Sequence, residues 1–356
     1  MIRSLSAVLL LSVGMLLFGG AKNSKRRHLP PPVNQPAPQP PRAYNLAGAF
    51  WAVNQPSIVK QDGTWYVFTG GKAPTGGQFT IRCSNDLKSW RLCGQVFKSV
   101  PDWIKRSSPQ TKELQSPDIS YFHGIYRLYY AYSDSGGNTS GIALATNRTL
   151  VGNSSEYQWD DQGLVLRSGQ NDSFNAVDPD FVVDAKGATW LAFGSLRSGI
   201  KLTALDPATG KPIAGHGLIS LASRHSPQNP TAGSQAIEAP SILHHGDYYY
   251  LFVSWDQCCR GANSSYRIMV GRAREITGPY LDRNGVPMTG GGGTQLLAGN
   301  ARWAGPGGES VLPGDGQMPD IIAFHAYDTT TGKPALQIST LTWQDGWPQA
   351  ALGTAK

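Results

Sequence analysis

The feature that most constrains the fold is a set of prolines that precede apolar segments at nearly constant spacing. Pro56, Pro117, Pro179 and Pro240 are separated by 61, 62 and 61 residues. After each comes a short apolar run, a polar or glycine-containing turn, and a second run rich in aromatic or β-branched residues, as in a hairpin. A less regular fifth unit spans residues 305–328. A repeat of this kind predicts an all-β, five-bladed β-propeller. A two-domain sandwich is the competing architecture, but it would not explain the even spacing.

Two segments precede the repeat. A basic start at residues 1–3, an apolar run at 5–18 and small residues at 19–21 predict a secretory signal peptide over residues 1–21. Residues 22–43 are rich in proline, which favours an extended linker. The propeller is therefore expected over residues 44–356. We expect a secreted protein, extracellular or periplasmic, with no membrane span once the signal is removed.

The formal charge of +7 arises in the N-terminal segment. Six of the 31 basic residues lie at or before Arg42, where no acidic residue occurs, and the domain that follows has 25 basic and 24 acidic residues. This balance argues against a nucleic-acid partner. A closed propeller has no long free strand edge, so we expect a monomer.

Four cysteines fit an exported protein. Cys83 and Cys93 are placed to bridge one hairpin. The adjacent Cys258 and Cys259 allow a disulfide between neighbours, two thiols, or bridges elsewhere, and the sequence leaves these alternatives open. No CxxC motif or matched histidine spacing accompanies them, so no zinc site is expected.

Acidic residues flank three of the repeated prolines. Asp118 follows the second proline, Asp178 precedes the third, and Glu238 stands two residues before the fourth. Because the first strand of each propeller blade lines the central axis, these acids should converge on one funnel. Two carboxyl groups across a glycosidic bond perform carbohydrate hydrolysis. Candidate substrate contacts are Asp118 itself, the aromatic side chains Phe50, Trp51, Tyr121, Phe174 and Trp255, and Asn175.

Glu238 is the strongest catalytic candidate. Ile237 and Ala239 flank it, and a carboxyl group in apolar surroundings holds its proton, which suits a general acid. An aspartate beside a proline is more often a turn cap, and Asp118 and Asp180 fit that interpretation. Unpaired buried glutamates are rarer.

From about Phe50 to Pro348 the chain resembles glycoside hydrolase family 43, and within it the endo-1,5-α-L-arabinanases. The resemblance implies a five-bladed propeller that hydrolyses α-1,5-linked arabinan, or a related furanoside-containing polysaccharide, with inversion. It implies Glu238 as the general acid and Asp178 as the carboxylate that orients this acid and keeps it protonated. The matching segments are residues 175–179 (NAVDP), 236–240 (AIEAP), 256–261 (DQCCRG), 276–280 (ITGPY), 305–307 (GPG) and 324–328 (FHAYD).

Two positions depart from the family pattern. The first blade of the family normally carries His-Asp-Pro, whose aspartate is the general base, whereas this chain has Asn54-Gln55-Pro56. A glutamine cannot accept a proton from water and at best positions it. The family also places a histidine after Gly-Pro-Gly, near a metal ion on the axis, and Gly308 stands there. An axial calcium or sodium ion would lack its usual histidine, so we assign no metal ligand and no certain cofactor.

These departures leave three interpretations open. The chain hydrolyses polysaccharide with Glu309 or Asp118 as the replacement base; it acts on another glycoside at a weakened rate; or it is a catalytically impaired propeller that binds arabinan-like polymers without cutting them. A structural interaction propeller with no sugar site would make no use of the axial acids. The sequence therefore predicts a glycosidase-like propeller whose turnover depends on what replaces the base.

Overall fold

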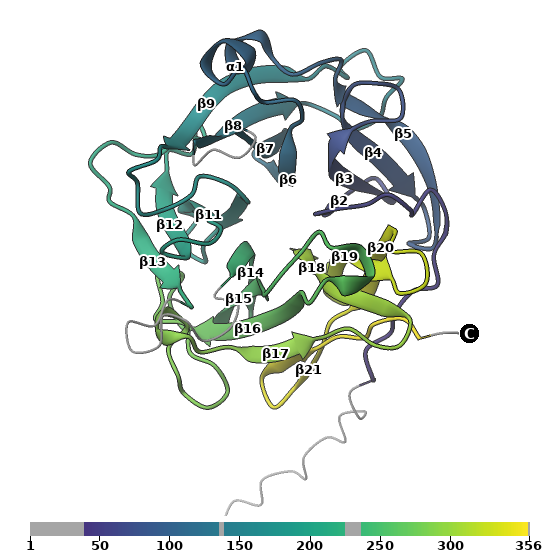
Figure 1. Cartoon of the computed structure of the whole chain (residues 1–356), viewed down its shortest axis with the longest axis vertical. Coiled ribbons are helices and arrows are strands. Elements are labelled where there is room, and N and C mark those ends of the chain that lie inside the picture. Colours follow the sequence, from purple (N-terminus) through teal and green to yellow (C-terminus); the bar gives the residue numbers. More distant parts are fainter. Residues whose placement is uncertain (1–38, 135–138, 225–235, 355–356) are drawn as a thin grey trace, which may run out of the picture. The chain divides into compact units, whose positions relative to one another are not determined.

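Antiparallel sheets follow one another around a central axis, and each begins with its innermost strand (Figure 1). The computed structural model describes residues 39–134, 139–224 and 236–354. The predicted signal peptide and residues 22–38 of the predicted linker lie outside these ranges.

The strands form five blades. Blade one is β2 (Ser57–Gln61), β3 (Thr64–Lys72), β4 (Gln78–Ser84) and β5 (Ser89–Phe97), and blade two is β6 (Gln115–Phe122), β7 (Ile125–Ser133), β8 (Ser140–Asn147) and β9 (Asp160–Ser168). Blade three is β10 (Asp180–Val183), β11 (Thr189–Phe193), β12 (Ile200–Leu205) and β13 (Ile219–Ala222), and blade four is β14 (Ile237–His245), β15 (Tyr248–Trp255), β16 (Arg267–Ala273) and β17 (Thr294–Leu297). Blade five is β18 (Trp303–Leu312), β19 (Ile321–Asp328) and β20 (Pro334–Thr340), followed by the hairpin β21 (Thr342–Gln344) and β22 (Trp347–Gln349).

This arrangement confirms the five-bladed propeller and excludes the two-domain sandwich. The hydrophobic core lies between blades: Phe68 and Phe79 of blade one are fully buried against Leu128 and Tyr130 of blade two. Within the described ranges the one α-helix is the short α1 (Asp102–Ser107), and no helix is long and apolar enough to cross a membrane.

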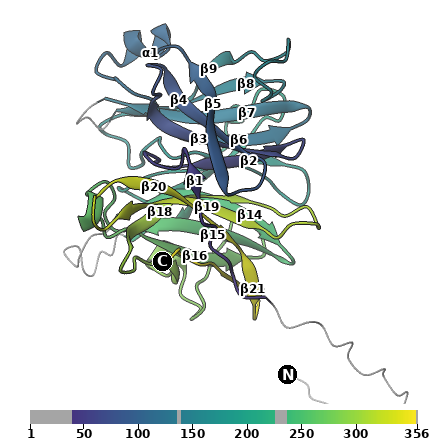
Figure 2. The ribbon, with the colours of Figure 1, turned by 90° about the vertical axis from the view of Figure 1, so that its right-hand side faces the viewer.

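The ring of blades is closed by the segment before β2. The Tyr44 amide donates to the Ile338 carbonyl at 2.9 Å, and the Leu336 amide donates to the Phe50 carbonyl at 2.8 Å, so this segment runs beside β20. Between these two contacts, β1 (Ala47–Gly48) pairs in parallel with β5 (Figure 2). The chain thereby joins the last blade to the first. The pairing begins at Arg42, whose amide donates to Thr340 Oγ1 at 2.9 Å.

The inner strands bend at the repeated prolines. The residue before each proline has a positive φ, and in blade five Gly308 precedes Glu309, which stands where the other blades have proline. Register shifts accompany these residues in β6, β14 and β18. A bulge of this kind aims side chains away from the ladder. The five equivalent residues are Gln55 (φ 46°), Ser116 (φ 50°), Asp178 (φ 53°), Ala239 (φ 53°) and Gly308 (φ 60°).

A closed belt of hydrogen bonds ties each inner strand to the next. The residue after each proline, or after Glu309, accepts a backbone N–H from the neighbouring blade, and the last of these bonds returns to blade one. Because each acceptor satisfies a buried N–H, the belt stabilises the closed ring. The bonds are Ile119 N to Ser57 Oγ (2.9 Å), Phe181 N to Asp118 Oδ2 (2.8 Å), Ile242 N to Asp180 Oδ2 (3.0 Å), Val311 N to Ser241 Oγ (3.2 Å) and Ile58 N to Ser310 Oγ (3.3 Å).

Candidate active site

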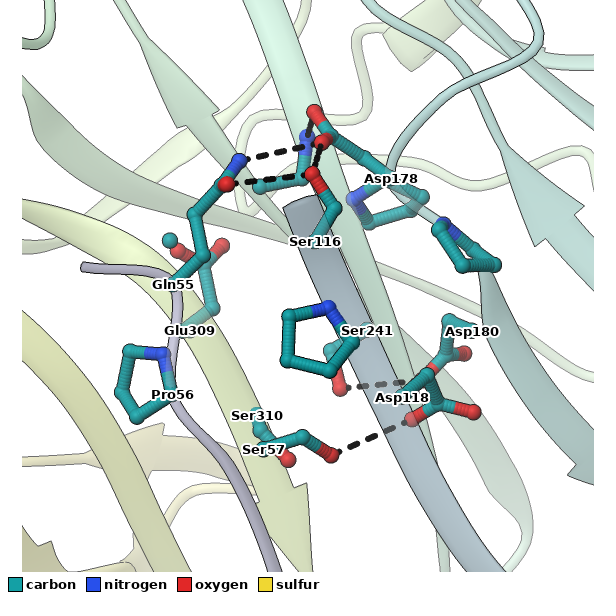
Figure 3. Close-up of a pocket in the computed structure, with 15 residues that line it drawn as sticks. Gln55, Pro56, Ser57, Ser116, Asp118, Asp178, Asp180, Ser241, Glu309 and Ser310 are labelled. Atoms are coloured by element: carbon teal, nitrogen blue, oxygen red, sulfur yellow. Dashed lines mark hydrogen bonds between the residues drawn. The ribbon is translucent and has the colours of Figure 1, made fainter. Parts of the chain in front are cut away.

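The acids expected to share one ring occupy different levels of the axis (Figure 3). Gln55, Ser116 and Asp178 form an upper level, and the belt with Asp118 and Asp180 forms a lower level. The prolines and Glu309 lie between them, around a cavity of about 30 Å³ that has room for ordered water. Residues that are one position apart in the repeat therefore lie at different levels and have different neighbours.

The upper level is a closed group of three side chains. Gln55 Nε2 donates to Asp178 Oδ1 at 3.0 Å, and Ser116 Oγ lies 3.0 Å from Gln55 Oε1. Ser116 Oγ also contacts Asp178 Oδ1, while the Ala239 amide donates to Asp178 Oδ2 at 3.1 Å. Asp178 is thus held from three blades.

The protonated form of Asp178 completes this group. Burial, reinforced by the negative charge of Glu238, raises the pKa of Asp178 to about 7. With a proton on Asp178, the carboxyl donates to Ser116, Ser116 donates to the Gln55 carbonyl oxygen, and the Gln55 amide donates back to Asp178. Each hydrogen then has one acceptor. The Gln55 amide is engaged with its neighbours, so it holds Asp178 instead of positioning a water molecule.

Glu238 lies one residue before this level, at the start of β14. Its side chain is half-buried, although Ile237 and Ala239 on either side are buried. The apolar setting expected from these neighbours is therefore incomplete, because they point to other faces of the strand. Ser195 Oγ donates to Glu238 Oε2 at 2.6 Å, and Tyr266 Oη donates to Oε1. The two hydroxyls fix the orientation of a carboxyl group that still reaches solvent.

Glu309 faces the axial cavity from β18. Ser254 Oγ donates to Glu309 Oε2 at 2.6 Å, whereas Oε1 is buried with no hydrogen-bond partner among the described residues. Burial raises the pKa of Glu309 to about 8. At neutral pH this residue is mostly a neutral acid, and it becomes a base only as the pH rises.

The axial residues do not fit the cation that the family resemblance implied. His325 is fully buried, its Nδ1 accepts the backbone N–H of Gln55 at 3.3 Å, and burial lowers its pKa to about 4. A neutral imidazole that accepts at Nδ1 carries its proton on Nε2, so neither nitrogen offers a lone pair to a metal. A Cβ at Gly308 would lie 2.9 Å from the His325 ring, which leaves no space for a histidine there. No group of three or more potential ligands is assembled in the described residues.

Most of the expected substrate contacts do not line the axial cavity. Trp255 is a core residue only 9 % exposed, covered by the Arg224 guanidinium at 4.3 Å from its ring. Phe174 packs edge-on against Phe193 at 5.8 Å, and Asn175 Oδ1 accepts the Ser140 hydroxyl. Tyr121 is exposed in a different cavity, at the end of β6 away from Ser116.

Two more of the expected contacts lie away from the upper level of the axis. Asp118 belongs to the belt: besides the Phe181 amide it has Ser57 Oγ at 3.5 Å, and burial raises its pKa to about 7. Such an engaged carboxyl is a poor replacement base and a poor substrate contact. Trp51 is half-buried in a second cavity, with the Phe50 and Trp303 rings at 4.9 and 6.0 Å.

The cysteines form two disulfides, Cys83–Cys93 across β4 and β5 and Cys258–Cys259 between neighbours. The first confirms the predicted hairpin bridge, and the second is one of the alternatives that the sequence left open. The Cys259 amide donates to Tyr327 Oη at 3.2 Å, and Tyr327 Oη donates to Asn54 Oδ1 at 3.3 Å. The vicinal pair is therefore linked to the residue next to Gln55.

The protein is a five-bladed propeller, and a hydrogen-bonded glutamate and a buried aspartate lie where its inner strands begin. This fold and these carboxyl groups are those of a glycoside hydrolase. The family model for glycosyl hydrolases family 43 matches residues 51–348, and the chain belongs to this family.

Relatives with assigned names agree with this family. The chain is 41 % identical over 307 residues to the extracellular endo-α-(1→5)-L-arabinanase 1 of Bacillus subtilis, covering 84 % of this chain and 90 % of the relative. It is 40 % identical over 304 residues to an extracellular exo-α-(1→5)-L-arabinofuranosidase of Cellvibrio japonicus, covering 83 % and 86 %. The solved endo-arabinanase of Bacillus licheniformis superimposes with a TM-score of 0.77 at 43 % identity, covering 86 % of this chain and 99 % of that one.

Proposed function

We propose that this protein is a secreted hydrolase of α-1,5-linked arabinan, or of a closely related furanoside polysaccharide. The observation that carries the proposal is Glu238, a half-buried carboxyl oriented by Ser195 and Tyr266 beside the buried Asp178. The two relatives are named for endo-α-(1→5)-L-arabinanase and exo-α-(1→5)-L-arabinofuranosidase activity, and a solved Cellvibrio relative is described as complexed with arabinohexaose. The two disulfides and the extracellular relatives support export.

In this proposal Glu238 is the general acid. It gives its proton to the departing sugar oxygen, and water attacks from the opposite face with inversion. Asp178 acts through position: it fixes the backbone beside Glu238 by accepting the Ala239 amide.

The base is supplied by Glu309. Gln55 has no basic site and its amide is engaged with Asp178. Glu309 lines the axial cavity beside Gln55 and keeps one oxygen without a partner among the described residues. Because its pKa is about 8, only a minor part of Glu309 is ionised and able to act as a base at neutral pH, so hydrolysis is slow and speeds up as the pH rises toward 8.

The second candidate is a propeller that binds arabinan without cutting it. The closed group of Gln55, Ser116 and Asp178 favours this alternative, because it fills the family's base position with side chains that satisfy one another.

Release of oligosaccharide from debranched arabinan tests both candidates. We expect slow release by the wild type that increases from pH 6 to pH 8, and loss of release in Glu238→Gln and in Glu309→Gln. Binding of the polymer without release at any pH would support the second candidate. Absence of binding to arabinan and to other furanoside polysaccharides would contradict both.

A further inference from the structure

A second cavity of about 400 Å³ lies at the seam where the chain closes the propeller. Its walls come from the segment before β2, the start of β18, β20, and the C-terminal residues Gly353 and Thr354. It shares no lining residue with the axial cavity. Its volume falls in the range of small-molecule sites. The aromatic side chains around it are Tyr44, Phe50, Trp51 and Trp303.

An amide in this cavity is available to a ligand. Gln337 of β20 lines the cavity, and its side chain forms no hydrogen bond within the described ranges. The residue as a whole is only 7 % exposed, but its amide atoms are not among the described side-chain atoms that are sealed from solvent without a partner. A ligand that enters the cavity can therefore replace water at this amide. Gln337 offers both a donor and an acceptor, as a sugar hydroxyl requires.

The charges of the cavity favour a neutral ligand. Arg302 lies over the Trp303 ring at 5.2 Å, and its Nη2 pairs with Asp328 Oδ2 at 2.9 Å. The guanidinium charge is thus balanced by a buried carboxylate. Flat aromatic walls with a few polar groups and no net charge suit a sugar ring, which presents C–H groups on its faces and hydroxyls on its rim.

The cavity lies within reach of the axial site. Trp51 precedes Gln55 by four residues, so their Cα atoms are at most about 14 Å apart. Trp303 lies at the start of β18, the strand that leads to Gly308 and Glu309. A polysaccharide whose cleavage point is at Glu238 therefore needs only a few sugar units to enter the second cavity.

We propose that this cavity is a distal sugar-binding site that holds a furanosyl unit of the same chain that occupies the axial site. The assignment rests on the proposed function, since it takes arabinan as the ligand. It predicts that affinity and polymer turnover grow with chain length beyond the units held at the axis.

Binding of α-1,5-arabino-oligosaccharides to Glu238→Gln tests the site without hydrolysis. We expect the indole signals of Trp51 and Trp303 in an NMR titration to shift with arabinohexaose and to shift much less with arabinobiose. Replacing Gln337 by Leu removes one hydrogen bond to the ligand, and replacing Trp51 by Ala removes one aromatic contact. Each should weaken hexaose binding about 2- to 12-fold and weaken biose binding less. Trp103→Ala, a half-buried tryptophan on α1, is the matched control and should change neither affinity.

The outcomes separate this proposal from the proposed function. Hexaose binding with no shift of the two indoles, or with no loss in both variants, would overturn the distal site. Indole shifts in a protein that never releases product would support the distal site and contradict hydrolysis alone. Failure of hexaose to bind at all would overturn both.

Discussion

Gln55 Nε2 donates a hydrogen bond to Asp178 Oδ1 at 3.0 Å, across 123 residues of sequence. The side chain that stands in the base position of blade one is therefore hydrogen-bonded to the aspartate of blade three. Ser116 of blade two completes the group, and the three residues occupy equivalent places in the repeat. In the proposed mechanism, the part of the site that protonates the leaving oxygen is kept around Glu238, whereas Gln55 replaces the residue that activates water in the family.

Replacing Glu238 is the first test of its proposed role as the general acid. Glu238→Gln keeps the size of the side chain but removes the transferable proton, and one of the two hydroxyls that donate to Glu238 must turn to accept from the new amide. We expect product release to fall at least about 10²-fold, while the affinity for arabino-oligosaccharides stays within about threefold. Release rates and calorimetric titrations measure the two quantities. Retained turnover in this variant would exclude Glu238 as the acid.

The backbone at Gly308 gives a prediction for stability. A non-glycine residue at φ 60° costs roughly 1–2 kcal/mol, and at Gly308 a Cβ would also press on His325 at 2.9 Å. Gly63 has φ 78° and open space around its Cβ position, so Gly63→Ala isolates the backbone cost. Chemical denaturation should show that Gly308→Ala loses about 1 kcal/mol or more beyond Gly63→Ala. Equal losses would mean that the axis has room for a side chain.

The belt predicts which serines hold the blades together. Ser241→Ala removes the acceptor of the Val311 amide and should lower the free energy of unfolding by about 1–3 kcal/mol. Ser120→Ala is the control, because Ser120 Oγ is buried without a hydrogen-bond partner in the described residues, and its loss should cost less than about 0.5 kcal/mol. A similar cost for both variants would argue against the belt.

The buried carboxyls predict how stability varies with pH. The folded pKa of Glu309, about 8, lies above its ordinary value of 4.5, so the fold favours the protonated form. The stability from this group is complete below pH 4.5 and is lost as the pH rises through 8. Glu309→Gln should flatten the decline of unfolding free energy between pH 5 and pH 8. Glu275→Gln, at an exposed side chain, should leave the decline unchanged. If the unfolding free energy of Glu309→Gln declines with pH as steeply as that of the wild type, Glu309 does not titrate in this pH range in the folded protein.

The sequence was sufficient for the fold because the repeat is regular. Prolines at a nearly constant period mark the bend of four inner strands, Gly308 and Glu309 form the fifth bend, and the five bends together close a ring. The belt was also readable: the residues that follow the bends are Ser57, Asp118, Asp180, Ser241 and Ser310, all short side chains that accept hydrogen bonds. Asp118 belongs to the belt and not to the upper level, because adjacent positions of the repeat lie at different levels of the axis.

Other site residues carry no local signal. Ser195 and Tyr266 reach Glu238 from outside β14, and Ser254 reaches Glu309 from blade four, so their roles depend on strand register and not on motif. Trp255 appeared as a sugar platform because exposed and buried aromatics look alike in sequence. The second cavity joins residues near 50 to residues near 337, a juxtaposition that only ring closure creates.

The most direct test is the rate of product release by Gln55→Asp, with Gln55→Asn as the control of matched size. Aspartate tolerates the positive φ of this position and supplies a carboxylate where the family has its base. We predict that Gln55→Asp releases arabino-oligosaccharides about 10²–10⁴-fold faster than the wild type at pH 6–7, and that Gln55→Asn does not. Equal rates for the wild type and Gln55→Asp, with arabinan bound by both, would contradict the claim that this site has kept its acid and lost the base that the family has at position 55.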